Sequence, residues 1–319
     1  MNRRFGLLVA AAAWGVTVPT SAWAQQRGDQ DHEWCEDVRR GDRDRERYCE
    51  VREFTLDARS LIAVDAGPNG GITVEGWNGS NIRVLARVQT WSRRGDPEDF
   101  LGDIEVITTG REIRSEGPRG RDIGRNNGWS VSYELMVPFE SDLSLESTNG
   151  GISITDVTGS MDFRTTNGGI NLAGLAGDVR GRTTNGSIRV DLEGAEWDGT
   201  GLDVQTTNGT VTLDIPEGFQ ADLEIGTTNG GFHIDFPITL QGRINRRRIR
   251  TELNGGGALI KAITTNGVVR FLRGLIWVLF VGGGLWGVSV TQRPTPYTLQ
   301  PAVPPSIPAP QTPDFLHTT

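Results

Sequence analysis

Apolar and polar residues alternate with a period of two around six Thr-Asn-Gly triplets between residues 148 and 267. Apolar residues stand six before each asparagine, and again three and five after it. The residue four after the asparagine is polar in every copy. This alternation buries one side of each segment, so each copy is predicted to be a strand, a tight corner and a second strand.

The corner motif recurs at intervals of about 20 residues, which is typical of stacked repeat units. The predicted structural corners are Asn149 and Gly150, Asn167 and Gly168, Asn185 and Gly186, Asn208 and Gly209, Asn229 and Gly230, and Asn266 and Gly267. The fifth and sixth copies stand further apart, and the sequence LNGG at Leu253–Gly256 predicts a degenerate copy between them. Because Asn and Gly tolerate positive φ, we expect a left-handed backbone at these corners.

Two all-β arrangements can use such a corner: the tip of a β-hairpin, or one corner of a coil in a β-solenoid. Stacking in register would place Asp162, Arg180 and Asp203 side by side with alternating charge, and Glu146 beside Arg164. Opposite charges across a ladder contribute a few tenths of a kcal/mol each, and stacked asparagines can form an amide ladder. Hairpins need no such matching, so the pattern favours a β-solenoid.

These repeats resemble the bacterial "putative adhesin" domain family of unknown function, which comprises exported, glycine-rich β-solenoids with TTNG-like corners. The resemblance runs from about Phe54 to Leu272 and includes less regular strands at Asn69–Val88 and Trp129–Pro138. It implies a cell-envelope location and an adhesin-like binding or scaffolding role without established catalytic residues. Some members of the family are associated with envelope-stress responses.

The domain organisation follows from composition. Residues 1–24 are predicted to be a secretory signal peptide, with Arg3 and Arg4, an apolar stretch and a small-residue cleavage site. We therefore expect the mature protein in the periplasm or on the cell surface. A charged segment (25–53), the β-solenoid domain (54–273), an apolar segment (274–290) and a Pro-rich disordered tail (291–319) follow.

The apolar run Leu275–Val290 is shorter than the roughly 20 residues that cross a membrane as a helix. It is interpreted as either a membrane anchor or a cap on the last coil. Cys35 and Cys49 are the two cysteines of the chain. In an oxidising compartment they are predicted to form a disulfide, which would stabilise by roughly 3 kcal/mol in the chain-entropy model.

The sequence predicts a non-enzymatic envelope protein that uses no cofactor. A net charge of −8 argues against nucleic acid as a partner. The first alternative is a polysaccharide-active enzyme, which would need convergent acidic or basic groups. Its candidates, which could equally be solvated strand positions, are Asp162, Asp203, Glu224 and His233.

The second alternative is a membrane-tethered sensor of envelope stress, which requires Leu275–Val290 to insert. The glycine-rich repeats lack a calcium-binding pattern, and no metal-ligand spacing recurs. The partner is expected to be a glycan or a protein of the envelope. Its candidate contacts are Trp197, which could instead pack over a coil edge, and a basic cluster that could instead be a solvated loop, formed by Arg246, Arg247, Arg248 and Arg250.

Overall fold

The computed structural model describes residues 33–36, 46–93, 96–109, 112–119, 122–124, 126–235, 242–244 and 247–273. The described residues lie in one compact unit, Met1–Gly274. The predicted signal peptide, the apolar segment from 274 and the Pro-rich tail lie outside the described residues. Short 3-10 helices are η1 (Glu33–Cys35), η2 (Gly67–Asn69) and η3 (Pro97–Asp103).

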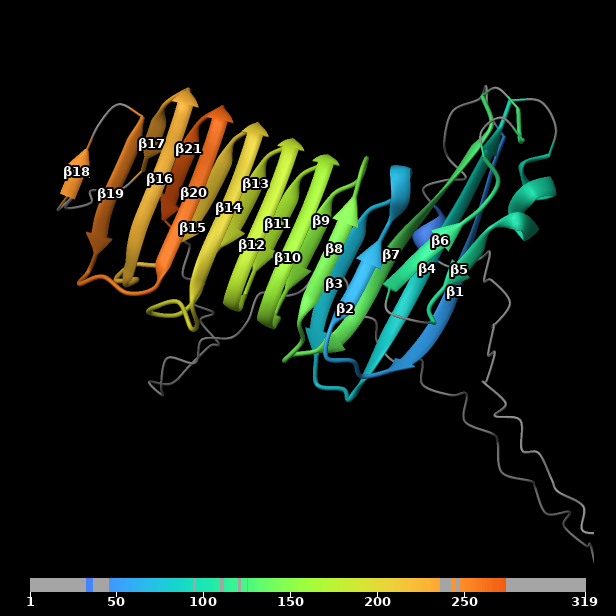
Figure 1. Ribbon diagram of the computed structural model, residues 1–319, viewed down its shortest axis with the longest axis horizontal. Helices are drawn as coiled ribbons and strands as arrows, with labels where there is room; N and C mark the ends of the chain where they lie inside the picture. Colours follow the sequence, from blue (N-terminus) through green and yellow to red (C-terminus); the bar gives the residue numbers. More distant parts are fainter. Residues whose placement is uncertain are drawn as a thin grey trace, which may run out of the picture. The chain divides into compact units, whose positions relative to one another are not determined.

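Two sheets make up the fold, as the sequence predicted for an all-β solenoid (Figure 1). Sheet A contains, in spatial order, β1 (Glu46–Asp57), β4 (Asn81–Ser92), β7 (Gly128–Pro138), β3 (Ile72–Trp77), β9 (Ile152–Thr155), β11 (Ile170–Ala173), β13 (Ile188–Asp191), β15 (Val211–Ile215), β21 (Val269–Arg273) and β17 (Phe232–Ile234). Sheet B contains β18 (Gly242–Ile244), β19 (Arg248–Leu253), β16 (Ala221–Asn229), β20 (Leu259–Asn266), β14 (Gly201–Asn208), β12 (Ala176–Asn185), β10 (Thr158–Asn167), β8 (Leu143–Ser147), β2 (Ile62–Asp65), β6 (Glu112–Glu116) and β5 (Glu105–Ile107).

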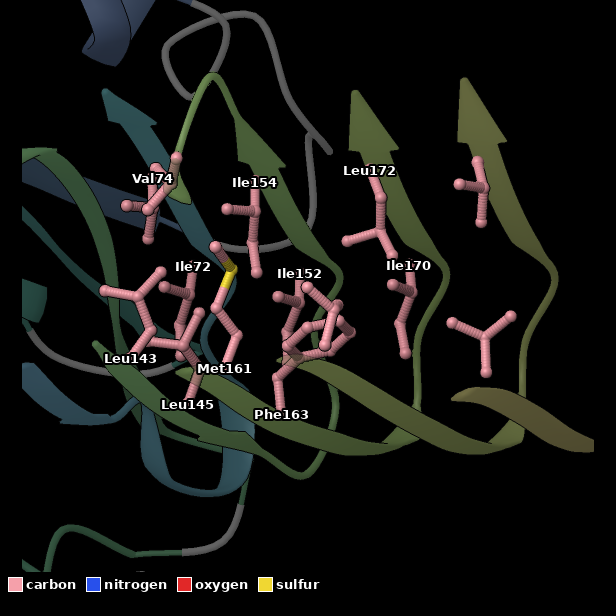
Figure 2. Packing of buried hydrophobic residues seen from close by; sticks show 14 of the residues in the cluster. Ile72, Val74, Leu143, Leu145, Ile152, Ile154, Met161, Phe163, Ile170 and Leu172 are labelled. Atoms are coloured by element: carbon pink, nitrogen blue, oxygen red, sulfur yellow. The ribbon is translucent and has the colours of Figure 1, made fainter. Parts of the chain in front are cut away.

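Each Thr-Asn-Gly corner joins a strand of sheet B to a strand of sheet A, and equivalent strands of successive coils pair in parallel and in register. The alternating residues of both sheets point into a single core between them. Figure 2 shows Met161 and Phe163 of β10 directed from sheet B toward sheet A, where Ile152 and Ile154 of β9 lie. The predicted period-2 pattern is therefore confirmed, and the outward positions form straight rows across the strands.

The first threonine of the motif is buried at the corner and joins neighbouring coils. Its hydroxyl donates to a glycine carbonyl of the adjacent coil at 2.8–2.9 Å, as between Thr183 and Gly168. The asparagine amides form a second ladder: Asn185 Nδ2 donates to Asn167 Oδ1 at 2.8 Å, and Asn208 Nδ2 donates to Asn185 Oδ1 at 2.8 Å. These repeated bonds satisfy the polar atoms of each corner and fix the register of the coils.

The glycine of the motif has a different role from the one that the sequence predicted. None of the six corner asparagines or glycines adopts a positive φ. A Cβ on Gly186 would instead lie 1.9 Å from the carbonyl oxygen of Gly168, and the other corner glycines are equally crowded, at 1.7–2.1 Å. Glycine is required because adjacent backbones approach too closely for any side chain.

The order of the coils also differs from the order of the sequence. Strand β20 lies between β14 and β16, and β21 lies between β15 and β17. The sixth copy is thus inserted between the fourth and the fifth. The predicted degenerate copy is not a coil, because β19 pairs antiparallel with β16 and ends at a turn. There Asn254 (φ 48°) and Gly255 (φ 108°) have the left-handed backbone expected at the other corners.

Candidate binding groove along the threonine corners

The outer face of sheet B carries a groove of about 430 Å³ that crosses β8, β10, β12, β14 and β20. Its floor is the backbone at the buried first threonines. One wall is a row of longer side chains, including Glu146, Arg164, Arg182 and Gln205, and the other is the row of second threonines, including Thr166, Thr184 and Thr207. Adjacent strands lie about 4.8 Å apart, so the groove is roughly 20 Å long.

Two arginines lie side by side in this groove. Arg164 and Arg182 are cross-strand neighbours on β10 and β12, and both are exposed. Arg164 NH2 lies 3.4 Å from Asp162 Oδ1, whereas Arg182 makes no ion pair with any described residue. Like charges in direct register destabilise a sheet. A rigid pair of guanidinium groups beside a line of hydroxyls can instead bind carboxylate or phosphate oxygens of a ligand.

The next row of outward side chains on sheet B, two residues earlier along each strand, differs from the arginine pair because its charges alternate in sign from strand to strand. In spatial order it reads Asp162, Arg180, Asp203, Lys261, Glu224 and Arg250. The predicted neighbours Asp162, Arg180 and Asp203 are confirmed, as is Glu146 beside Arg164. The arginine pair in the groove therefore departs from the pattern that otherwise governs this face.

A second hollow, of about 590 Å³, lies beside the last strands of sheet B. It is lined by Arg247 and Arg248 of the predicted basic cluster, together with Ile263, which also lines the groove. Arg248 and Arg250 both pair with Glu224, at 3.5 and 3.0 Å. Arg246 lies outside the described residues, so the basic cluster stays a prediction as a partner contact, with Arg248 and Arg250 partly neutralised by Glu224.

Trp197 does not face solvent, so its interpretation as a partner contact is wrong. Its side chain belongs to the core, with 7% exposure, and its Nε1 donates to the carbonyl of Gly177 at 3.0 Å. The loop that carries it folds back over the coil edge because the indole has both an apolar body to bury and one donor to satisfy.

The proposed catalytic candidates lie at separate places. Asp203 pairs with Lys261 Nζ at 2.8 Å on sheet B, and Glu224 binds the arginines described above. His233 lies on sheet A, where its Nε2 is 2.6 Å from Asp235. Only Asp162 of the four lines the groove. Within the described ranges no group of three or more His, Cys, Asp and Glu side chains could hold a metal ion.

The N-terminal part of the domain contains the predicted disulfide, which joins Cys35 to Cys49 on β1. On β3, burial raises the pKa of Glu75, and the negative charges of Asp156 and Glu134 raise it further. Burial also raises the pKa of Asp156.

Within the described part of the chain, no helix is both long and apolar enough to span a membrane.

The groove itself was missed in the sequence, although its signal was present. Its two walls are formed by the residues that stand three before and one before each asparagine. The sequence already predicts that Glu146 and Arg164, both three before an asparagine, are neighbours, and they are. The adjacency of Arg164 and Arg182 follows from the same offset.

A model of the Toastrack DUF4097 family matches residues 102–270, which is more than half of the chain. Solved structures that are similar to the chain include a "putative cell adhesion protein" from Clostridium sporogenes, with 9% identity, a TM-score of 0.40 and coverage of 70% of this chain and 99% of that one. A "putative adhesin" from Bacteroides fragilis has 11% identity, a TM-score of 0.35 and coverage of 70% and 96%. A "putative lipid binding protein" from Parabacteroides distasonis has 11% identity, a TM-score of 0.28 and coverage of 70% and 97%. No curated protein matches the chain.

Proposed function

The chain belongs to the Toastrack DUF4097 family, and we propose that it is an exported, adhesin-like, non-enzymatic binding or scaffolding protein of the bacterial cell envelope. One observation carries the proposal: the groove on sheet B, in which Arg164 and Arg182 stand beside a row of exposed threonines. Its partner would be an extended envelope component, a glycan or a protein segment, lying across the coils.

The mechanism is display on a rigid surface. The strands hold the groove side chains at fixed spacing through the threonine and asparagine ladders, so binding does not require the backbone to become ordered. A partner with anionic groups would bridge the two guanidinium groups, and the threonine hydroxyls would bond to its polar atoms. Export is supported by the predicted signal peptide and is consistent with the Cys35–Cys49 disulfide.

The test is binding of purified protein to envelope fragments prepared from the host bacterium. We expect Arg182→Ala to weaken binding about tenfold or more, because a hydrogen bond to a charged group contributes about 1.5–3 kcal/mol. Arg270→Ala removes an exposed arginine from sheet A and should leave binding unchanged. Equal binding by both variants would rule out the groove as the site.

The same incubations separate binding from catalysis. The enzyme alternative requires the release of new reducing ends or unsaturated sugars, whereas a binding protein releases none. Such release, if abolished by Asp162→Asn, would replace our proposal with the polysaccharide-active enzyme. The envelope-sensor alternative rests on Leu275–Val290, and retention of the chain in a washed inner-membrane fraction would support it.

A further inference from the structure

A third hollow lies on sheet A, away from the groove on sheet B. It has a volume of about 280 Å³ and crosses the neighbouring strands β4, β7, β3, β9 and β11 of sheet A. Its walls carry one indole, one guanidinium and several small polar groups: Trp34, Arg87, Thr73, Ser132, Ser153 and Asn171. These polar side chains alternate with core residues along their strands, so they point outward.

The floor of this hollow is made by Gly71 and Gly151, the second glycines after their asparagines. Stacking leaves more room here than at the first glycines, so a side chain would need the neighbouring backbone to move by only a few tenths of an ångström. A Cβ at Gly71 would lie 3.3 Å from the nearest backbone oxygen, and one at Gly151 would lie 3.2 Å away. Neither residue has a positive φ. The next coils carry Ser187 and Thr210 at the same position.

Other coils carry a side chain at this position, so the fold accepts one there. The effect of glycine at positions 71 and 151 is to keep the floor of the hollow open. Glycine at such positions lets another molecule approach the backbone closely. Gly169, the equivalent glycine on the following coil, does not line the hollow, although Asn171 of that coil does.

Several contacts hold the indole at the hollow, among them a disulfide next to it in the sequence and a cation–π contact. Trp34 precedes Cys35, whose disulfide to Cys49 fastens this segment to β1. The guanidinium carbon of Arg87 lies 4.7 Å from the centre of the indole ring, and Arg87 NH1 donates to the carbonyl of Trp34 at 3.0 Å. A cation at this distance attracts the ring. Trp34 lies outside the sheet and packs against the small cluster of Cys35, Cys49 and Val51, so breaking the disulfide would loosen both its chain segment and this packing.

We propose that this hollow binds one sugar unit of a glycan, and that the Cys35–Cys49 disulfide is required for binding because it positions Trp34. A sugar ring has an apolar face that packs on an indole and hydroxyl groups that pair with hydroxyl and amide side chains. The volume is slightly below that of pockets for drug-sized ligands, about 300–1,000 Å³, and suits a single ring. The site lies on a different sheet from the groove, so it does not depend on the proposed function.

The test is titration of the mature protein with glucose, N-acetylglucosamine and glucuronic acid, each up to tens of millimolar, followed by NMR chemical shifts. We expect at least one sugar to shift the signals of residues around the hollow. Gly151→Ser fills the floor with the side chain that the fold accepts at position 187, and it should weaken binding at least tenfold. Gly169→Ser makes the same change on the following coil, at a glycine that does not line the hollow, and should leave binding intact.

Two further measurements connect binding to Trp34. Trp34→Ala, and separately reduction of the disulfide, should each weaken binding at least tenfold while the β signal in circular dichroism is retained. Arg182→Ala in the groove should have no effect, so failure of the proposed function would not be mistaken for failure of this site. The proposal is overturned if none of the three sugars binds, or if Gly151→Ser and Gly169→Ser bind equally.

Discussion

The role of the corner glycine can be tested by a single methyl group. In Gly168→Ala the new Cβ would lie 2.1 Å from the carbonyl oxygen of Gly150 on the adjacent coil. This is more than 1 Å inside an ordinary contact of about 3.5 Å. The same oxygen accepts the hydroxyl of Thr165 at 2.8 Å, so the oxygen cannot move away without breaking that bond. The coils must separate, or the corner must change its shape.

The cost follows from the bonds at that corner. Besides the threonine bond, Asn167 donates from its backbone to Thr148 at 2.7 Å and from its side chain to Asn149 at 2.7 Å. Losing two or three of these at about 1 kcal/mol each, with the strain of overpacking, predicts destabilisation by about 2–4 kcal/mol. For a domain of this size that lowers the Tm by about 5–15 °C.

The neighbouring glycine provides the control. A Cβ on Gly169 would lie 3.3 Å from the nearest atom, the oxygen of Ser187, so Gly169→Ala should cost less than about 1 kcal/mol. Both variants change one glycine to alanine in the same corner, and their unfolded states are nearly equivalent. Thermal unfolding followed by circular dichroism measures both. If the two midpoints fall by the same amount, contact between coils is not the reason for the glycine.

Two other predictions concern charge. Lys261→Glu places a like charge between Asp203 and Glu224, so we expect the free energy of unfolding in urea to fall by about 1–2 kcal/mol at low salt and by less in 1 M salt. Lys261→Met should lower it less than Lys261→Glu does. Equal losses for Lys261→Glu at low salt and in 1 M salt would contradict the charge ladder. Glu75→Gln should raise the Tm at pH 7 and leave it unchanged well below pH 4.5. The pKa of Glu75 is raised from 4.5 in the folded state, so the folded protein loses stability as the pH rises from that value; a gain of equal size at both pH values would contradict this account.

Much of the solenoid could be predicted from the sequence because the information is local. The period-2 pattern specified which residues of each strand face the core, and equal offsets from the asparagine specified which residues become neighbours on stacked coils. The sequence also showed that a glycine follows each corner asparagine, but it did not show why glycine is required there. Asn-Gly often signals a left-handed turn, whereas here the crowding comes from a different coil, which single-segment reasoning does not include.

Contacts between residues far apart in the sequence account for the other features that the sequence did not predict. Trp197 stands in a polar loop, and only the folded chain reveals that the Gly177 carbonyl, 20 residues earlier, accepts its indole N–H. The groove required all coils in register before its two walls could be recognised. The sugar-sized hollow needed still more, since Trp34 is far from these strands in the sequence and is brought to sheet A by the disulfide, by packing against Val51 and by Arg87.

The inserted sixth copy has a physical reason in the charge ladder. Strands β16 and β20 end in the same Thr-Thr-Asn, so either could stack on β14 through the same threonine and asparagine bonds. In sequence order Asp203 would face Glu224, two like charges in direct register. The insertion instead places Lys261, the single lysine of the chain, between them, with its Nζ 2.8 Å from Asp203. Because the inserted coil is the last to be synthesised, the fifth coil cannot reach its final neighbour until residue 273 is present, and folding of this end must wait for nearly the whole domain.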